Sequence, residues 1–309
     1  MERDTERLYT RYRPLLFSLA YRMLGTAADA EDVVHDVFIR LEEQPIEAKA
    51  HMKAYLCKMT TNRCLDVLKS ARVKREVYIG PWLPEPVPTG EHDPAAVYLQ
   101  DESVSYAILL LLESLEPEER AVYILREAFA FDYRTIAEAV GRSEASCRKT
   151  MSRLRPKLAA ALPEAGLLSA AEAEPLARQF LHAARTGDMQ GMMELLHPDV
   201  VLRADGGGRV TAAVRPVSGA SSVAAFLGGL FRKYIGLAAN PESAPEPDAN
   251  NAVQAAGEPL SLRSVNGRTG IVFTDGQTAN TVFVVEASAG RITSVYVVRN
   301  PEKLERIRG

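Results

Sequence analysis

In residues 1–72, apolar positions recur at the 3.6-residue spacing of amphipathic helices. One apolar stripe covers Leu8–Leu24, and Gly25 is a natural stop for that helix. Two more stripes of the same kind cover residues 33–41 and 51–70. The pattern therefore predicts an all-helical domain.

The rest of the chain divides into three parts. Residues 73–100 are rich in proline and are predicted to be a linker. Helical periodicity returns in residues 101–163, which predicts a second all-helical domain. Residues 170–309 open with two amphipathic helical segments and then change to short β-branched runs, which predicts an α+β domain. Within it, residues 240–259 are predicted to be a long loop.

The last domain is expected to hold a bent antiparallel sheet. Short runs of β-branched and apolar residues, bounded by turn-forming residues, indicate its strands. These runs cover residues 197–205, 209–217, 260–274, 278–287 and 291–300.

The segment 132–158 combines the features of a helix-turn-helix. A short apolar helix ends at Gly141, which permits a left-handed turn, and Ser143 is placed to cap the next helix. That helix would bury an apolar stripe and expose a basic face toward DNA. Pro156 is expected to bend or end it. The DNA-facing residues would be Arg142, Ser143, Ser146, Arg148, Lys149, Ser152, Arg153 and Arg155. The alternative is a surface helix with solvated charges.

Charge supports this interpretation only locally. The net charge is −3, but a DNA reader needs a basic face rather than a basic total. Basic residues cluster in residues 63–75 and 142–157, whereas acidic residues cluster in residues 29–36 and 113–119.

Composition excludes several other classes. The chain is 47% hydrophobic and 25% charged, and no run approaches the roughly 20 apolar residues of a membrane span. The N-terminus is charged and lacks a signal-peptide core, so we expect a cytoplasmic location without a membrane partner. Cys57, Cys64 and Cys147 form no CxxC pair and are expected to be buried apolar residues. We expect no metal and no cofactor.

Three segments resemble parts of bacterial sigma factors, in the same order. AEDVVHDVFIRL, residues 30–41, resembles the polymerase-binding helix of sigma region 2. Residues 54–76 resemble the next helix, which reads and opens the −10 element, and residues 115–155 resemble sigma region 4, which reads the −35 element. Together they resemble the extracytoplasmic-function sigma factors, group IV of the sigma-70 family. This implies a protein that binds core RNA polymerase and promoter DNA and directs transcription initiation.

The resemblance implies two more sets of site residues. The polymerase-binding set is Asp29, Glu31, Asp32, Asp36, Phe38 and Leu41. Its acidic members could equally form an ordinary solvated face. The −10 set is Asn62, Arg63, Asp66, Lys69, Arg72, Lys74 and Arg75. Aromatic residues are sparse there, so we expect a polar base pocket rather than a stacking platform.

Three short motifs narrow the resemblance. They are WLPEP (Trp82, Leu83, Pro84, Glu85, Pro86), DGGGR (Asp205, Gly206, Gly207, Gly208, Arg209) and NPEKL (Asn300, Pro301, Glu302, Lys303, Leu304). The set resembles the subgroup with a fused SnoaL-like C-terminal domain, the sigma factor J type, where a lysine commonly stands in place of Arg209. This implies a nuclear transport factor 2-like cone in residues 170–309.

We expect these motifs to make intramolecular contacts between the C-terminal domain and the sigma domains. Such contacts would regulate activity in place of a separate anti-sigma factor. The segment Asp205–Arg209 could be a hairpin tip, a weak phosphate-binding loop or a docking loop. Trp82 could be a local staple, but we favour an anchor in a neighbouring domain.

Two other functions stay open. The chain could be a helix-turn-helix regulator that senses an unknown small ligand in the C-terminal cavity. It could instead be a SnoaL-type enzyme, for which the candidate polar groups are His182, Asp188, His197, Asp205 and Tyr296. No Ser/His/Asp or metal-ligand set is visible, so we assign no catalytic residue.

Overall fold

The computed structural model describes residues 2–43, 51–75, 78–89, 105–162, 166–235, 260–275 and 278–307. The chain divides into two compact units. The first unit comprises Met1–Tyr78 and Thr89–Glu164, and the second comprises Ile79–Pro88 and Ala165–Gly309. Part of the proline-rich linker therefore folds together with the C-terminal part of the chain.

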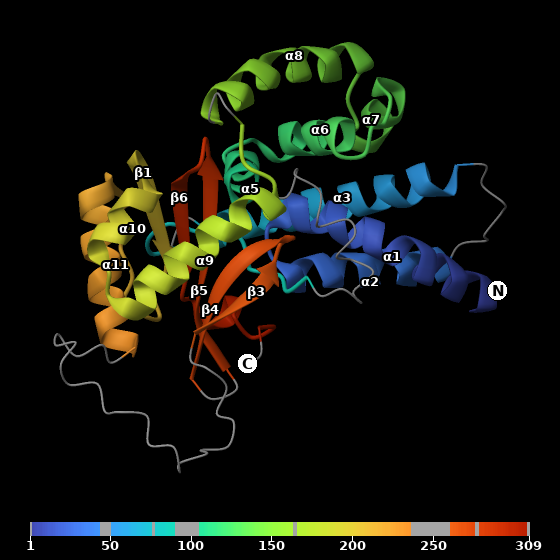
Figure 1. Cartoon of the computed structure of the whole chain (residues 1–309). Coiled ribbons are helices and arrows are strands. Elements are labelled where there is room, and N and C mark those ends of the chain that lie inside the picture. Colours follow the sequence, from blue (N-terminus) through green and yellow to red (C-terminus); the bar gives the residue numbers. More distant parts are fainter. Residues whose placement is uncertain are drawn as a thin grey trace. The chain divides into compact units, whose positions relative to one another are not determined.

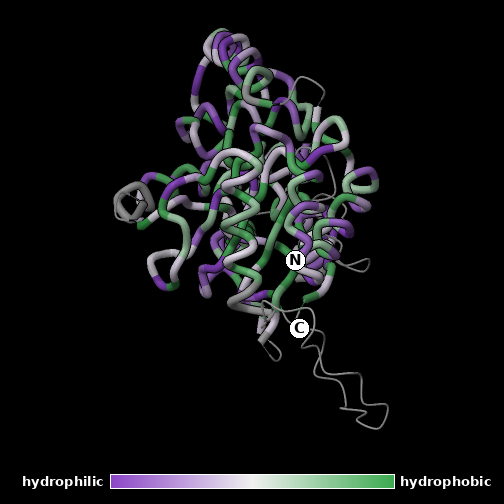
Figure 2. The backbone as a smooth tube through the Cα atoms, turned by 60° about the vertical axis from the view of Figure 1, so that its left-hand side comes forward, coloured by the Kyte–Doolittle hydropathy of each residue, from purple (hydrophilic) through white to green (hydrophobic). Residues whose placement is uncertain are grey.

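The described part of the first unit is helical (Figure 1). Its helices are α1 (Glu2–Leu24), α2 (Ala27–Glu42), α3 (Met52–Arg75), α5 (Tyr106–Glu113), α6 (Pro117–Glu127), α7 (Tyr133–Val140) and α8 (Glu144–Ala161). Hydrophobic and hydrophilic stretches alternate along the coiled backbone of the helices (Figure 2), as expected for helices with one buried face. Gly25 adopts φ +74° after α1, so it ends that helix as predicted.

Helices α6 and α7 pack against α1 and α3. The buried guanidinium of Arg120 on α6 donates hydrogen bonds to the carbonyl of Met23 and, at 3.0 Å, to that of Glu113. A carboxylate oxygen of Glu113 lies 3.0 Å from the same guanidinium. The two helical segments of the sequence therefore form one packed unit.

The second unit is an α+β structure. Its elements are α9 (Ala170–Thr186), α10 (Met189–Leu195), β1 (Leu196–Asp205), β2 (Val217–Ser218), α11 (Ala220–Ile235), β3 (Leu260–Val265), β4 (Arg268–Asp275), β5 (Thr278–Ser288), β6 (Arg291–Val298) and the 3₁₀ helix η3 (Pro301–Lys303). The sheet has the strand order β2-β1-β6-β5-β4-β3. Side chains of α9, α10 and α11 share one apolar core with the sheet.

Two expectations about this unit were wrong, and one of its helices was not predicted. Strand β1 pairs with β6 in parallel, so the sheet is mixed rather than antiparallel. Of the strand predicted in residues 209–217, only Val217 lies in a strand, and Pro216 directly before it has no amide hydrogen to donate to a neighbouring strand. Helix α11 was not predicted, since its two adjacent glycines, Gly228 and Gly229, weaken the helical signal. The loop expected in residues 240–259 lies outside the described residues.

The predicted fold class is confirmed. All-helical segments carrying a helix-turn-helix precede a C-terminal α+β unit in which helices pack on a six-stranded sheet. Among the helices that the structure describes, none combines the length and apolar character needed to cross a bilayer.

An aromatic cluster at the centre of the second unit provides a test of its packing. The ring of Phe231, which is 1% exposed, lies 5.4 Å from that of Phe283 and 6.1 Å from that of Phe273. We expect Phe231→Ala to lower the free energy of unfolding of this unit by about 3–5 kcal/mol, measured by urea titration. Val214→Ala, at an exposed position, should change it by less than about 0.5 kcal/mol. Equal shifts of the two midpoints would contradict this packing.

Candidate nucleic-acid interface and linker anchor

The predicted helix-turn-helix is formed by α7 and α8. Gly141 ends α7 with φ 68° and ψ 33°, the left-handed conformation expected there. The hydroxyl of Ser143 then accepts a hydrogen bond of 3.2 Å from the amide of Ser146 and so caps α8. At the start of α7, the carboxylate of Asp132 accepts a bond from the amide of Thr135, which lowers the pKa of Asp132. Local caps and a left-handed glycine therefore end α7 and start α8 where the sequence predicts.

Helix α8 buries one face and exposes the other. Cys147, Met151, Leu154 and Leu158 are buried, as their spacing predicts. Pro156 lies inside α8 and does not end it, because the helix continues to Ala161. Of the residues predicted to face DNA, Ser146 is half-buried and the others are exposed: Arg142, Ser143, Arg148, Lys149, Ser152, Arg153 and Arg155.

Several of these arginines are paired with glutamates. Arg153 forms an ion pair with Glu119, and Arg155 donates to Glu127 at 2.8 Å, which raises the pKa of Arg155. Both glutamates lie on α6. Exposed pairs of this kind contribute at most about 1 kcal/mol, so a phosphate can displace the carboxylate. The sequence shows the acidic cluster but not that it lies beside α8.

The polar side of α3 carries the residues assigned to the −10 element. Asn62, Asp66 and Lys69 are exposed. Arg63 is half-buried and donates a hydrogen bond of 2.7 Å to the carboxylate of Asp36 on α2. This ion pair joins a predicted DNA-binding residue to a predicted polymerase-binding residue. Arg72, Lys74 and Arg75 lie on the backbone of α3, but their side chains fall outside the described part.

The acidic residues of α2 lie mostly at the surface. Asp29 and Asp32 are exposed, and Glu31 lies 3.8 Å from the guanidinium of Arg13 on α1. Glu31 and Asp32 also line a cavity of about 300 Å³ between α1 and α2. By contrast, two residues assigned to the polymerase are buried: Phe38 and Leu41. They belong to the core of the bundle and hold the acidic face in place.

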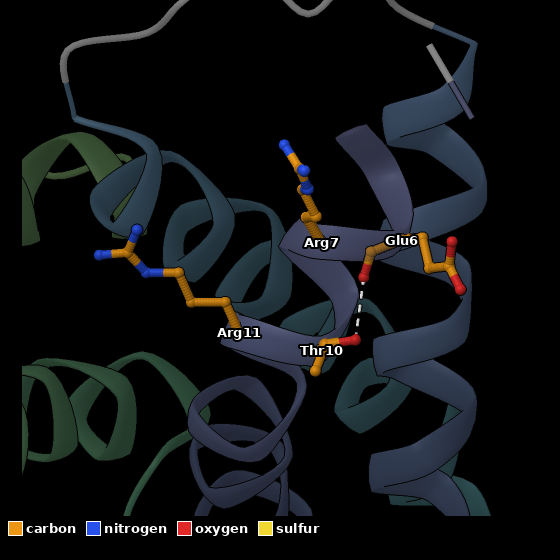
Figure 3. A pocket seen from close by; sticks show the side chains of 4 residues that line it. All are labelled: Glu6, Arg7, Thr10 and Arg11. Atoms are coloured by element: carbon orange, nitrogen blue, oxygen red, sulfur yellow. Dashed lines mark hydrogen bonds between the residues drawn. The ribbon is translucent and has the colours of Figure 1, made fainter. Parts of the chain in front are cut away.

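A second hollow, of about 460 Å³, lies along the N-terminal part of α1 (Figure 3). In the figure, Arg7 and Arg11 extend outward, and the hydroxyl of Thr10 donates to the carbonyl of Glu6 at 3.1 Å. All of these side chains are exposed and come from one helix. The hollow is therefore a surface groove rather than an organised site.

The three short motifs meet in the second unit at a buried ion pair. Asp205, at the end of β1, is fully buried, and Lys303 in η3 is 6% exposed. One carboxylate oxygen of Asp205 accepts bonds from the Lys303 ammonium at 2.7 Å and from the backbone amide of Leu83 at 2.8 Å. The ammonium also donates to the carbonyl of Leu83 at 2.5 Å and lies 4.2 Å from the centroid of the Trp82 ring. We call this group, Trp82, Leu83, Asp205 and Lys303, the linker anchor.

The glycines of DGGGR allow the chain to turn tightly beside the linker anchor. A Cβ atom at Gly206 would clash with the carbonyl of Val210, and one at Gly207 would clash with the side chain of Asn300. Gly207 also has φ +61°, a conformation that other residues rarely adopt. Its amide donates to the second carboxylate oxygen of Asp205 at 2.9 Å.

The linker is held at two further points. Glu85, which is buried, lies 3.1 Å from the guanidinium of Arg306. The amide of Val87 donates to the side chain of Asn266 at 2.7 Å, and the amide of Asn266 donates to the carbonyl of Val87 at 2.8 Å. Neither Arg306 nor this role of Asn266 could be predicted from the sequence, because both residues act only through contacts with distant residues. Ile79–Pro88 thus runs from the end of β1 to the turn between β3 and β4.

The other motif residues surround these contacts. Leu83, which is fully buried, is the apolar anchor, whereas Trp82 is half-buried and covers the Lys303 ammonium. Trp82 thus contacts Lys303 of the second unit, and Leu83 has the more deeply buried side chain. Arg209 and Glu302 form an exposed ion pair of 2.7 Å. Further motif residues are buried, namely Pro84, Pro86, Asn300 and Leu304, and Pro301 is exposed.

The polar groups considered for catalysis do not converge. His182 is exposed on α9, Asp188 caps α10, and His197 accepts a bond from the amide of Asp199. Tyr296 is buried and donates to Glu286 at 3.2 Å, and burial raises its pKa well above the ordinary value. Within the described residues, no group of His, Cys, Asp and Glu side chains could hold a metal ion.

The cysteines are free and buried. Burial raises the pKa of Cys57 to about 12 and also raises the pKa of Cys64. Both thiols are therefore protonated and unreactive at neutral pH.

Comparison with known proteins defines the class. Residues 8–73 match the family Sigma-70 region 2, and residues 105–158 match Sigma-70, region 4. With the helix-turn-helix at α7 and α8, these matches identify a sigma factor of the sigma-70 family.

The relatives define the group more closely. The chain is 38% identical over 228 residues to the ECF RNA polymerase sigma factor SigJ of Mycobacterium tuberculosis, covering 72% of each chain. It is 34% identical to the probable ECF RNA polymerase sigma factor SigI of the same organism, over 61% of this chain and 66% of that one. The crystal structure of M. tuberculosis SigJ superposes with a TM-score of 0.74 at 30% identity, covering 96% of this chain and 97% of that chain. The chain therefore belongs to the extracytoplasmic-function RNA polymerase sigma factors, and the resemblance seen in its sequence is confirmed.

The single tryptophan allows a direct test of the linker anchor. We expect Lys303→Met to shift the emission of Trp82 to longer wavelength and to increase its quenching by iodide, because the buried Asp205 carboxylate loses its cation and the linker detaches. Arg209→Gln breaks only an exposed pair and should leave the emission unchanged.

A second variant distinguishes detachment of the linker from unfolding of the whole second unit. Asp205→Asn combined with Lys303→Met removes both charges, so it should retain the native circular dichroism while Trp82 becomes accessible. Native-like emission and quenching in both variants would show that this ion pair does not hold the linker.

Proposed function

We propose that the C-terminal unit regulates promoter-specific transcription initiation by this sigma factor, and that it does so by holding the linker. The family acts through RNA polymerase, and this chain carries both of its DNA-binding regions. The observation that carries the regulatory proposal is the linker anchor, in which Asp205 and Lys303 bind the backbone of Leu83 in a buried site.

We assign one binding partner to the exposed face of each of three helices, α8, α3 and α2. The basic face of α8 would read the −35 element, with arginines on base edges and Lys149 on phosphates. The polar face of α3, with Asn62 and Lys69, would hold the −10 element. The acidic residues of α2 would bind core RNA polymerase.

The linker connects the region that ends with α3 to the region that begins with α5. With Ile79–Pro88 held in the second unit, less chain is available for those regions to separate and span two promoter elements. A tethered contact benefits from an effective concentration near the millimolar range, so a modest affinity is sufficient. The C-terminal unit would thus take the place of a separate anti-sigma protein and act where the polymerase is, in the cytoplasm.

The other two functions have less support. A ligand-sensing helix-turn-helix regulator does not need the α1–α3 bundle that matches sigma region 2. An enzyme needs convergent polar groups, whereas four of the candidates bond residues outside their own set: Asp188, His197, Asp205 and Tyr296.

The first test concerns α8. We expect the double variant Arg148→Ala and Lys149→Ala to lower promoter affinity of the reconstituted holoenzyme roughly tenfold or more, because each lost contact costs about 1–3 kcal/mol. Fluorescence anisotropy and run-off transcription would measure it. Arg178→Ala, which removes an exposed arginine on α9, is the control and should leave both unchanged. Full activity of the double variant would exclude α8 as the reading helix.

The second test concerns regulation. Deleting residues 300–309, or introducing Lys303→Met, should change run-off transcription from a cognate promoter at least about tenfold. A broken buried pair costs about 3–5 kcal/mol, which exceeds the roughly 1.4 kcal/mol of a tenfold change. Arg209→Gln should not change it. If the deletion and Lys303→Met both transcribe like the intact chain, the regulatory role is refuted, while promoter recognition stands.

A further inference from the structure

A cavity of about 400 Å³ lies in the second unit, within the range typical of small-molecule sites. It is bounded by α11, by the ends of β1 and β6, and by residues 211–213. Ala204 and Val297 form its buried floor, and Phe226 and Leu230 of α11 form one wall. The exposed residue Gly229 lies at its rim, so the cavity is open to solvent.

The lining is apolar apart from two residues, of which one is charged. Thr211 and Arg299 are its polar members, and the lining includes no acidic residue. The guanidinium of Arg299 donates a hydrogen bond to the carbonyl of Thr211, which holds the cation at one end of the cavity. An apolar cavity with a fixed guanidinium suits a ligand with an apolar body and a carboxylate, because an arginine can bind a carboxylate through parallel hydrogen bonds.

The same strand ends carry the linker anchor. Ala204 precedes Asp205, and Arg299 precedes Asn300. Side chains alternate along a strand, so Ala204 faces the cavity while Asp205 faces the linker on the opposite side of the sheet. The amides of Arg299 and Asn300 both donate to the carbonyl of Asp205, at 2.7 and 3.0 Å. A shift of Arg299 is therefore transmitted directly to the anchor.

We propose that this cavity binds a small amphipathic carboxylate, with its apolar chain along α11 and its carboxylate on Arg299, and that occupancy loosens the linker anchor. The inference about the anchor rests on the proposed regulatory function, whereas the binding site stands without it. The ligand would then be the signal that the fused unit detects.

Binding is tested by isothermal titration of the full chain with decanoate and with decanol, an uncharged probe of the same length. Decanoate should bind at one site about tenfold more tightly than decanol, because the charge-assisted bonds to Arg299 are lost with the alcohol. Arg299→Gln should remove this preference, and Arg299→Lys should keep part of it. Equal affinity for the two probes in the unmodified chain would overturn the assignment of a carboxylate.

Gly229→Leu locates the site. A Cβ atom at Gly229 meets no other atom within 4 Å, so a larger side chain fills the cavity without strain, and replacing a helical glycine favours folding. This variant should weaken decanoate binding at least about tenfold. Gln179→Leu, at an exposed position of α9 outside the cavity lining, is the matched control and should bind normally. Unaltered binding by Gly229→Leu would place the ligand elsewhere.

The fluorescence of Trp82 in the same samples measures whether ligand binding loosens the linker anchor. Saturating decanoate should increase the quenching of Trp82 by iodide in the unmodified chain and not in Gly229→Leu. Binding without any change at Trp82 would overturn the coupling alone. Absence of decanoate binding in a chain whose transcription still responds to Lys303→Met would refute the ligand site and leave the regulatory function intact.

Discussion

The contact between the linker and the rest of the second unit centres on one buried ion pair, between Asp205 and Lys303. Burying two charges is costly, and attraction between them offsets that cost only when their remaining hydrogen-bonding groups are also satisfied. Here the backbone of Leu83 supplies both an amide and a carbonyl, and Gly207 supplies a second amide. The ion pair is therefore complete only when the linker is in place. An interaction of this kind confers specificity for one position of the linker more than it adds stability.

On helix α8 of the first unit, by contrast, the ion pairs are exposed to solvent rather than buried. On α8, Arg153 and Arg155 pair with glutamates of α6 at the surface, where water and salt weaken the attraction. Such exposed pairs contribute at most about 1 kcal/mol, so little free energy is needed to break them. The buried pair holds a segment in place, whereas the exposed pairs leave their cations available to a partner.

In the second unit, the ends of strands β1 and β6 carry both the linker anchor and the apolar cavity. Their parallel pairing brings Asp205 next to Arg299 and Asn300, although nearly a hundred residues separate them in the sequence. One face of the pair carries the linker anchor and the other carries the apolar cavity. The ends of β1 and β6 therefore contribute both to the linker anchor and to the cavity in which we propose that a ligand binds.

Local features of the sequence determined much of this protein. The periodicity of apolar residues predicted α1, α2, α3 and α8, and Gly141 and Ser143 marked the helix-turn-helix because turns and caps involve only neighbouring residues. The three motifs also identified the residues of the linker anchor. The sequence did not indicate α11 or the parallel pairing of β1 with β6.

What the tertiary structure decided is which residues become neighbours. It placed Glu119 beside Arg153, Asp36 beside Arg63, and Leu83 rather than Trp82 in the core of the second unit. It also enclosed the cavity at Arg299 from elements far apart in the chain. Side-chain partners and cavities arise from packing between distant segments, and no local pattern of hydrophobic and polar residues specifies which segments will meet.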